Sequence, residues 1–356
     1  MGNRAEIIPA EIYETPEAIR ATLDAVASAA HDAATAMRER ATRRVFFVGN
    51  GTSHYTGLAA GYTARALAGP EAPLFLAVPA GDFRHLTPAL GPWDTIIGMS
   101  ASGEFRDVLA VFDRWRGRCL RIGITQVPGS SLARLADMVL VCGGGPSRVP
   151  VMTKTYATTL TAAHLLVLEY FGAPRPYVAD LAASADRCAE ALRGAEAALG
   201  GAVDVLASME HAFYFGAGSG YAAAAESALK MKEMALLHAE GSETWEMASG
   251  PATMVSSRTF CVALYTGSPA DEGSAQVASR VRTWGAPLLE IGPRGAAGHW
   301  HVPVAAPAYE SFASLALVPV AALLAYRVAR ARGLEPDAPT WRERYRQLGM
   351  THLAGA

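Results

Sequence analysis

Cysteine is scarce in this sequence, and its four copies are scattered. None of them forms a CxxC pair, the spacing typical of zinc ligands and redox motifs. They are Cys119, Cys142, Cys188 and Cys261. The sequence therefore indicates neither a disulfide framework nor a zinc site, and we expect no metal and no other cofactor.

Lysine is rarer still among the 356 residues. Lys154, Lys230 and Lys232 are the only lysines, and the other 28 of the 31 basic residues are arginine. The 33 acidic residues bring the net charge to −2. A protein that binds nucleic acid needs a basic face for the phosphate backbone, so this balance argues against a nucleic-acid partner.

Long apolar runs are also missing. The first 17 residues, MGNRAEIIPAEIYETPE, contain no apolar core of the kind found in a secretory signal. The longest apolar stretch, Phe312 to Tyr326, has 15 residues and includes Ser314, whereas a membrane-spanning helix needs about 20. We therefore expect a buried helix there, no membrane association, and a soluble cytoplasmic protein.

What the sequence does have is a regular alternation of apolar strands and helical patterns. A helical segment over residues 1–40 comes first. Apolar strands are then predicted at residues 44–48, 74–78, 95–99, 121–124 and 138–142, with helical patterns between them. Strands that are apolar throughout and alternate with helices indicate an α/β fold whose parallel sheet is covered on both faces.

Small polar residues follow the first and the third of these strands. The first loop, GNGTS, contains Gly51, Thr52 and Ser53, and the other, SASGE, contains Ser100 and Ser102. These hydroxyls could be no more than helix caps. However, ligands of open α/β sheets bind beyond the carboxyl ends of the strands, where two helix N-termini would also attract an anion. We therefore predict that both loops face one crevice that binds a phosphate monoester.

The strand, glycine turn and helix around the first loop recur 167 residues later. There FGAGS (215–219) is followed by an alanine-rich helical pattern. Further strands are predicted at 212–215, 260–265, 287–291 and 301–304, and a helix at 309–332. We therefore expect two copies of one α/β unit, separated near residues 174–183. The predicted segments are an N-terminal helical segment at 1–40, domains at 41–174 and 175–340, and a tail at 341–356.

The helical pattern after the second glycine turn carries titratable residues at its far end. Lys230 and Glu233 come about four turns into it, and His238, Glu240 and Glu246 follow. Lys230 and Glu233 are three residues apart, so they could also form a simple ion pair on a helix surface. Glu233 lies 14 residues, about 21 Å, along the helix from the glycine turn. A phosphate bound at this turn would therefore lie far from these groups, so a ligand that meets Glu233 must have its phosphate bound elsewhere, and we expect the first domain to bind it.

Four stretches together resemble a known family. They are SASGE, TKTYATTL (153–160), SALKMKEMALLHAE (227–240) and LLAYRVARARGLEPDAP (323–339). With the paired glycine turns, they are similar to the tandem sugar-isomerase (SIS) domains of the glucosamine-6-phosphate synthase group, over about residues 10–340. That group includes amino-sugar-phosphate deaminases and fructosamine-6-phosphate deglycases. The resemblance implies two three-layer α/β/α sandwiches with parallel sheets, a sugar-phosphate ligand, and a homodimer whose sites are completed across subunits.

The resemblance also implies roles for individual residues. The family's phosphate ligands fall at Ser53, Ser100, Ala101 and Ser102, beside Gly51 and Thr52. The catalytic glutamate, which moves a proton between C1 and C2, falls at Glu233. Lys230 and His238 match other catalytic positions, and Glu246 and Arg344 match substrate-binding positions.

Three positions depart from the family pattern. Phe105 stands where a threonine usually follows the Gly-Glu pair, which removes a hydroxyl from the phosphate cradle and adds bulk beside it. Ser249 stands where the synthase has the histidine credited with opening the sugar ring, and serine is a poor acid–base catalyst at neutral pH. Arg344 stands where the tail has a lysine, and arginine stays protonated and cannot form a Schiff base.

These features favour an enzyme acting on a phosphosugar or an amino-sugar phosphate, either an isomerase or an isomerising deaminase or deglycase. Glu233 can serve as the base that moves a proton between neighbouring carbons. The sequence lacks the glutamine-hydrolysing domain with which the synthase begins, so we expect no ammonia release from glutamine. Two alternatives stay open: a catalytically silent sugar-phosphate sensor, and an enzyme for an atypical or unphosphorylated sugar-like metabolite.

Overall fold

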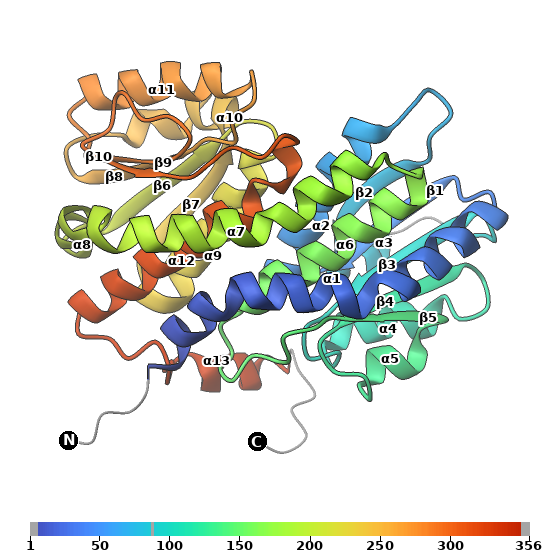
Figure 1. The fold of residues 1–356 in the computed structure, drawn as a ribbon. Helices are drawn as coiled ribbons and strands as arrows, with labels where there is room; N and C mark the ends of the chain where they lie inside the picture. Colours follow the sequence, from blue (N-terminus) through green and yellow to red (C-terminus); the bar gives the residue numbers. More distant parts are fainter. Residues whose placement is uncertain (1–5, 87–88, 350–356) are drawn as a thin grey trace. The chain divides into compact units, whose positions relative to one another are not determined.

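A computed structural model describes residues 6–86 and 89–349 (Figure 1). The chain forms two compact units. Glu17–Ala182 and Thr340–Ala356 make up what we call the β1–β5 unit. Met1–Pro16 and Ala183–Pro339 make up the β6–β10 unit. The main divide falls inside helix α7 (Arg175–Ala198), between Ala182 and Ala183.

The units are not contiguous in the sequence, whereas contiguous domains were expected. The first 16 residues belong to the β6–β10 unit, and the tail after Pro339 belongs to the β1–β5 unit. Helix α1 (Ile7–Glu39) therefore contributes to both. At its start, the backbone N–H groups of Ile7 and Ile8 donate hydrogen bonds to the Asp337 carboxylate, at 3.3 and 2.8 Å. These bonds satisfy N–H groups that a helix start otherwise leaves open.

The β1–β5 unit is built on a five-stranded parallel sheet in the order β2-β1-β3-β4-β5 (Figure 1). Its strands are β1 (Arg44–Gly49), β2 (Leu74–Pro79), β3 (Asp94–Met99), β4 (Leu120–Thr125) and β5 (Met138–Val141). Its helices, besides most of α1, are α2 (Thr52–Leu67), α3 (Ala80–Leu86), α4 (Arg106–Arg114), α5 (Ser131–Leu135), α6 (Lys154–Phe171) and the short α13 (Arg342–Gln347).

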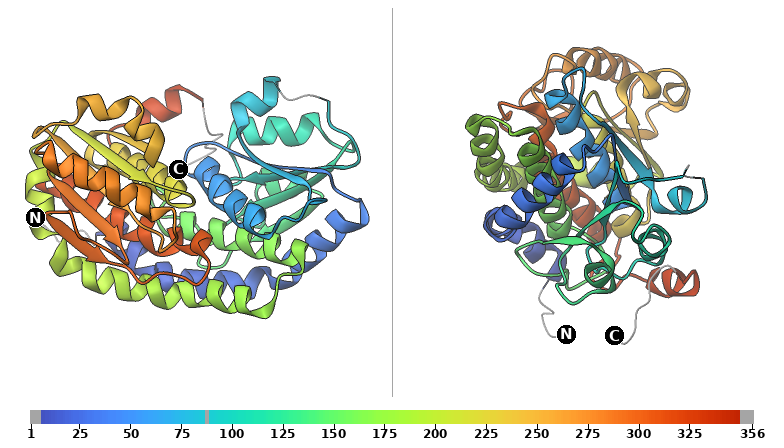
Figure 2. Two further views of the ribbon diagram at one scale, coloured as in Figure 1. Left: turned by 90° about the horizontal axis from the view of Figure 1, so that it is seen from above. Right: turned by 90° about the vertical axis from the view of Figure 1, so that its right-hand side faces the viewer.

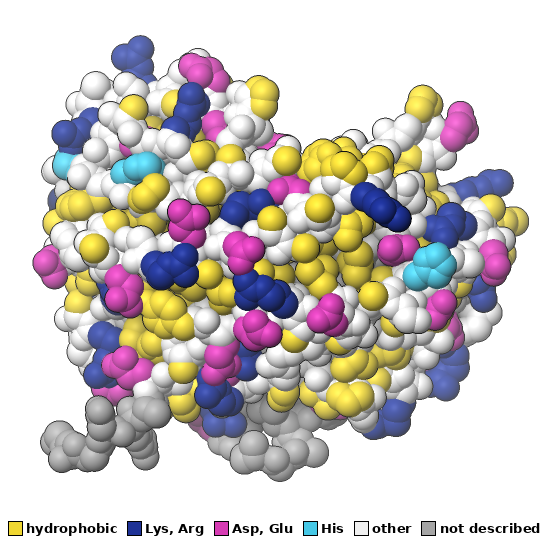
Figure 3. Space-filling model, in the orientation of Figure 1, with side chains coloured by type: hydrophobic (Ala, Val, Ile, Leu, Met, Phe, Trp, Pro, Cys, Tyr) yellow, Lys and Arg dark blue, Asp and Glu magenta, His cyan; other side chains and the backbone are white. Residues whose placement is uncertain are grey.

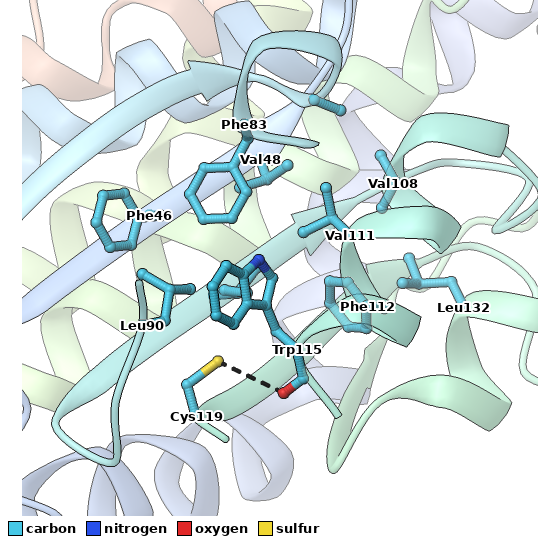
Figure 4. Packing of buried hydrophobic residues seen from close by; sticks show 12 residues of the cluster. Phe46, Val48, Phe83, Leu90, Val108, Val111, Phe112, Trp115, Cys119 and Leu132 are labelled. Carbon is cyan, nitrogen blue, oxygen red and sulfur yellow. Dashed lines mark hydrogen bonds between the residues drawn. The ribbon is translucent and has the colours of Figure 1, made fainter. Parts of the chain in front are cut away.

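Side chains of the central strands alternate between two apolar layers. Phe46 belongs to a buried cluster with residues of α3, α4 and α5, including Phe83, Phe112 and Leu132 (Figure 4). Phe47, the next residue, lies against the opposite layer, where α2 packs on the strand so closely that Gly57 has no room for a side chain. Helices therefore cover both faces of the sheet, as the apolar strands predicted.

The β6–β10 unit has a second parallel sheet with the order β10-β9-β8-β6-β7 (Figure 2). Its strands are β6 (His211–Gly216), β7 (His238–Glu243), β8 (Thr259–Leu264), β9 (Leu288–Gly292) and β10 (Trp300–Pro303). Its helices are α8 (Gly200–Ala207), α9 (Gly220–Ala235), α10 (Thr244–Ala248), α11 (Asp271–Thr283), α12 (Ser314–Ala331) and the 3₁₀ turns η1 (Pro251–Met254) and η2 (Glu310–Phe312). Numbered from its own first strand, this sheet has the same strand order as the other. The predicted α/β fold with two parallel sheets is confirmed.

Strand β7 is the one strand that the sequence did not predict. No strand was expected after the helical pattern that follows the second glycine turn, and this helix, α9, ends at Ala235. Leu236 takes a left-handed backbone with φ +51°, which stops the helix. The chain then pairs with β6 as an edge strand of the sequence HAEGSE. This strand has no apolar alternation, so periodicity gave no signal for it.

The apolar segment near the C-terminus forms α12, which packs against α9 and α8 in the β6–β10 unit. By length and composition, residues 310–331 could cross a membrane, but 94% of the most apolar window is buried inside the protein. The expectation of a buried helix is confirmed. The surface is mixed in charge: on the face drawn in Figure 3, basic and acidic side chains are interspersed, in keeping with the net charge of −2.

The contact between Gly98 and Phe112 gives a test of the packing in the β1–β5 unit. A Cβ at Gly98 would lie only 2.1 Å from the fully buried Phe112 ring. We expect Gly98→Ala to lower the free energy of unfolding by about 1–3 kcal/mol, because overpacking forces the ring to shift. Adding Phe112→Leu should recover part of that loss.

Gly194→Ala is the matched control for denaturant unfolding, because Gly194 lies inside α7 with no atom within 4 Å of its added Cβ. It should leave stability unchanged or raise it by up to about 1 kcal/mol. Equal unfolding midpoints for Gly98→Ala and the parent protein would contradict the packing described here.

Candidate active site

The two predicted phosphate loops start side by side at one edge of the sheet in the β1–β5 unit. Strands β1 and β3 are paired and parallel, with Val48 opposite Gly98. The loops that follow them therefore leave from the carboxyl edge at neighbouring positions. In a sheet of order 2-1-3-4-5, the connection after the first strand and the connection after the third run in opposite directions from this point. Ligands of such folds bind there. Both loops thus leave the same edge of the sheet, and the crevice expected between them stays a prediction.

The first loop turns sharply at Gly51 and leads directly into α2. Gly51 has φ +53° and ψ −126°, a backbone conformation open to glycine and strained for other residues. Helix α2 begins at Thr52, and the buried Ser53 donates its backbone N–H to the Asn50 carbonyl oxygen at 3.1 Å. The Asn50 side chain in turn accepts the backbone N–H of Ala80 at 2.8 Å, which ties the loop to α3. The loop is thus held in place without a ligand.

The second loop is fixed on the neighbouring strand β4. Ser100 donates its backbone N–H to the Ile124 oxygen at 3.2 Å, and the Ala101 oxygen accepts the backbone N–H of Gln126 at 3.0 Å. Gly103 has φ +69°, and a Cβ there would lie 2.1 Å from the Ser130 hydroxyl. Both the backbone conformation and the space therefore require glycine at this position.

The serine hydroxyls of this loop do not cap the helix that follows. Ser100 Oγ accepts the backbone N–H of Gly103 at 3.1 Å, and Ser102 Oγ accepts that of Glu104 at 3.2 Å. Helix α4 begins at Arg106, and its capping residue, Phe105, provides no side-chain hydrogen bond. The interpretation of these hydroxyls as caps of α4 is therefore wrong.

The side chain of Phe105 is part of the packing in the β1–β5 unit. Its half-buried ring packs against the apolar cluster under α3, α4 and α5. The bulk expected beside the phosphate cradle stays a prediction, and the structure adds that the side chain contributes to the core. The loss of a hydroxyl at this position stands, since phenylalanine has none.

In the β6–β10 unit, α9 carries a buried cluster of one lysine and two glutamates. Lys230 has no exposed surface, and its Nζ lies 2.6 Å from Glu233 Oε2 and 3.2 Å from Glu226 Oε1. Glu226 is also fully buried, whereas the side chain of Glu233 is 25% exposed. The ion pair between Lys230 and Glu233 exists, but the interpretation as a surface pair is wrong because its lysine lies inside the protein.

The pKa of Lys230 reflects this arrangement. Burial acts to lower the pKa, but the two neighbouring carboxylates outweigh it and raise the pKa above the ordinary value for lysine. Lys230 therefore stays an ammonium ion at neutral pH, where it can hold a carboxylate but cannot act as a base or a nucleophile. Glu226 was missed in the sequence. Its spacing of four residues before Lys230 and seven before Glu233 was the available signal, because such residues share a helix face.

The remaining predicted residues lie elsewhere. His238 is exposed at the first position of β7, with its ring centroid 5.5 Å from that of His211. Glu246 is exposed in the first turn of α10, where its backbone N–H donates to Glu243 Oε2 at 3.2 Å. Ser249 donates its hydroxyl to the Trp245 carbonyl oxygen at 2.6 Å. Arg344 is exposed on α13, which belongs to the same unit as the phosphate loops.

Across residues 6–86 and 89–349, no group of three or more His, Cys, Asp or Glu side chains is arranged to hold a metal ion. The four cysteines are all buried and form no disulfide among themselves.

The buried cluster on α9 predicts a large effect on stability. We expect Lys230→Met to lower the free energy of unfolding by about 3–5 kcal/mol, because it leaves buried carboxylates without their cation. Lys232→Met, two residues away and exposed, should change it by less than about 0.5 kcal/mol. Denaturant unfolding of the two variants checks this.

The double variant Glu226→Leu/Lys230→Met should regain much of the loss, since it removes a buried charge of each sign. If Lys230→Met and Lys232→Met are equally stable, Lys230 is not the buried partner of two carboxylates.

Comparisons with known proteins agree with this architecture. A family model described as SIS domain matches residues 40–169 and 205–292. The chain is 32% identical over 360 residues to the glutamine–fructose-6-phosphate aminotransferase (isomerizing) of Symbiobacterium thermophilum, covering 95% of this chain and 58% of that protein. It is 29% identical over 341 residues to the enzyme of the same name from Methanothermobacter thermautotrophicus, covering 92% and 55%. The chain thus spans little more than half the length of these relatives.

Two solved structures extend the comparison to the fold. The C-terminal domain of glucosamine-fructose-6-phosphate aminotransferase from Francisella tularensis superposes with a TM-score of 0.84 at 22% identity, covering 95% of this chain and 99% of that one. Glucosamine-6-phosphate deaminase from Thermotoga maritima superposes with a TM-score of 0.75 at 25% identity, covering 94% and 97%. Because the SIS model matches more than half of the sequence and both sheets have the expected strand order, this chain belongs to the SIS domain family.

Proposed function

We propose that this protein is an aldose–ketose isomerase of sugar phosphates, or an isomerising deaminase or deglycase of amino-sugar phosphates. The observation that carries the proposal is the setting of Glu233. One carboxylate oxygen is held 2.6 Å from a buried ammonium, while a quarter of the side chain remains exposed. A carboxylate that is fixed on one side and accessible on the other is suited to proton transfer with a bound substrate.

The reaction needs one base that serves two neighbouring carbons. Glu233 removes the proton from the carbon next to the carbonyl, which leaves an enediolate. A proton then passes from the hydroxyl oxygen to the former carbonyl oxygen, and Glu233 returns its own proton to the former carbonyl carbon. The substrate is thereby converted between aldose and ketose without a net change in protons. Lys230 is a positioning residue: its charge, anchored by Glu226, fixes the orientation of the Glu233 carboxylate.

We propose that the substrate phosphate binds at the carboxyl edge of the β1–β5 unit. Gly51, Thr52 and Ser53 lie at the start of the 16-residue helix α2, and the loop from Ser100 to Ser102 leads toward the nine-residue α4. Both helix starts present backbone N–H groups and the positive end of a helix dipole. The names of the relatives, which include fructose 6-phosphate and glucosamine 6-phosphate, support a phosphorylated sugar.

A sugar-phosphate sensor without catalysis is the second candidate, and Ser249 favours it. Its hydroxyl is engaged with the carbonyl oxygen of Trp245, at the end of α10. Serine at this position offers no acid–base group for ring opening, and Arg344 offers no amine for a Schiff base. A protein with these two changes could retain the phosphate site and lose turnover.

We further propose that the chain forms a homodimer. Several large apolar side chains are exposed on the two units, among them Trp93, Trp245, Met254 and Trp284, at 47–59%. Apolar groups of this size are often covered in an assembly. Sedimentation at micromolar concentration should show two chains per particle, and a monomer would contradict this part of the proposal.

Glu233→Gln tests the catalytic role. The amide keeps the shape and removes the base, so turnover of the substrate should fall by at least about 10²-fold while its binding changes little. Glu210→Gln, an exposed glutamate in the same unit, should leave both unchanged. Steady-state kinetics and calorimetry measure the two quantities. Equal turnover in Glu233→Gln and the parent protein would remove the proposed base.

Single serine-to-alanine changes test the phosphate site. Ser53→Ala, Ser100→Ala and Ser102→Ala should each weaken sugar-phosphate binding by about 1–2 kcal/mol, because backbone N–H groups supply most of the attraction. Ser208→Ala is the control, since that exposed hydroxyl bonds only the Val205 carbonyl oxygen in its own helix. Calorimetry should show no such loss for the unphosphorylated sugar. If phosphorylated and unphosphorylated sugars bind equally well, these loops do not hold a phosphate.

A further inference from the structure

The β6–β10 unit repeats the turn that begins the phosphate crevice of the β1–β5 unit. Strand β6 is paired with β8 as β1 is paired with β3. Gly218, which follows β6, has φ +55°, and Gly51, which follows β1, has φ +53°. Each glycine leads into a helix of 16 residues, α9 or α2. By backbone alone, both units therefore have a turn that could receive an anion.

The turn after β6 already faces a carboxylate from the chain itself. The two carboxylate oxygens of Glu310 lie 3.3 and 3.4 Å from the place where a Cβ on Gly218 would be. Ser219, which is fully buried, donates its hydroxyl to the main-chain oxygen of Glu310 at 2.9 Å. Because this second bond involves the backbone, it holds η2 against the turn whatever the side chain at position 310.

The loop after β8 is also occupied by a carboxylate. The backbone N–H groups of Thr266 and Gly267 donate to the two oxygens of Asp271, at 3.2 and 2.7 Å. The Thr266 hydroxyl lies 3.3 Å from Asp271 Oδ1 and 3.4 Å from Glu310 Oε2, so it joins the two acidic residues. Donors of this second loop are therefore bound to carboxylate oxygens.

The corresponding loop of the β1–β5 unit differs in this respect. Its acidic residue, Glu104, turns to α5 and accepts the backbone N–H of Ser131 at 2.8 Å. The hydrogen bonds within the loop run between backbone groups and the hydroxyls of Ser100 and Ser102. The hydrogen bonds described for residues 100–103 thus involve hydroxyls and backbone groups, whereas the loop after β8 is bonded to the carboxylate of Asp271.

We propose that Glu310, supported by Asp271, is a built-in anion that closes the second crevice to phosphate, so that each chain binds phosphate in the β1–β5 unit alone. The part that concerns the β1–β5 unit rests on the proposed function; the closure of the second crevice does not. An incoming phosphate would meet like charges and a space already filled, which opposes binding.

Removal of the Glu310 side chain would leave room for a phosphate ion. A cavity of about 310 Å³ adjoins the carboxylate and is lined by residues 267–270, 307–308 and Glu310 itself. Ser268 adds a hydroxyl to this lining, and Arg294 lies near enough to Asp271 to counter part of its charge. Space for an anion is thus present beside the turn, and the carboxylate of Glu310 opposes its binding there.

The experiment counts inorganic phosphate bound per chain, by equilibrium dialysis with radiolabelled phosphate. Glu310→Ala should bind one phosphate more per chain than the parent protein. Glu272→Gln is the control, because Glu272 is an exposed acidic residue beside Asp271 and should give no additional site. Glu310→Ser, which also opens the space, serves as a second variant if Glu310→Ala fails to fold.

The measured quantity is the difference in bound phosphate per chain between the variant and the parent protein. This difference separates the inference from the proposed function. A parent protein that binds no phosphate counts against the phosphate site of the β1–β5 unit, while a gain of one site in the variant still supports the closure. An equal count in the parent and both Glu310 variants overturns the closure. So does a parent protein that already binds two phosphates.

Discussion

The catalytic account depends on one buried ammonium ion, that of Lys230. A charge taken out of water costs several kcal/mol unless opposite charges stay beside it. Glu226 and Glu233 supply those charges at 3.2 and 2.6 Å, and all three residues project from a single helix. Because Glu226 and Lys230 are wholly buried, packing of α9 against β6, β7 and α12 sets the position of Glu233. The proposed base is therefore placed by the core of its unit.

The strand order determines which loops lie next to each other in each unit. Both sheets place the first and third strands of the unit side by side, so two loops leave the same carboxyl edge in each. In the β1–β5 unit these loops are shaped by glycines and hydroxyls. In the β6–β10 unit the same edge holds Glu310 and Asp271, while the titratable cluster lies about four turns along α9. We thus propose phosphate binding by one copy of the fold and proton transfer by the other.

The strands and the two loops at the edge of the first sheet could be predicted from the sequence, because they depend on local patterns. Each of the nine predicted strands is present within one or two residues at its ends, since buried parallel strands are apolar throughout. The loops at Gly51 and Ser100 were found because glycine and small hydroxyl residues follow those strands directly.

Other features depended on distant residues or on burial, which local patterns do not report. Strand β7 was missed because the edge strand is polar. Lys230 and Glu233 could be placed on one helix, but only the fold shows that the lysine is buried. Glu310 comes 92 residues after Gly218, and nothing in either stretch signals that they meet. Phe105 was interpreted from its neighbours in sequence, whereas its ring packs against the apolar cluster under α3, α4 and α5.

Proton transfer by Glu233 is tested most directly by exchange of substrate hydrogen with solvent. The protein is incubated with hexose and hexosamine 6-phosphates in D₂O, and deuterium at C1 and C2 is followed by NMR. The account predicts that deuterium enters at these carbons at a rate that falls with Glu233→Gln and not with Glu210→Gln. No exchange with any of these sugar phosphates, or equal exchange in Glu233→Gln and the parent protein, would contradict it.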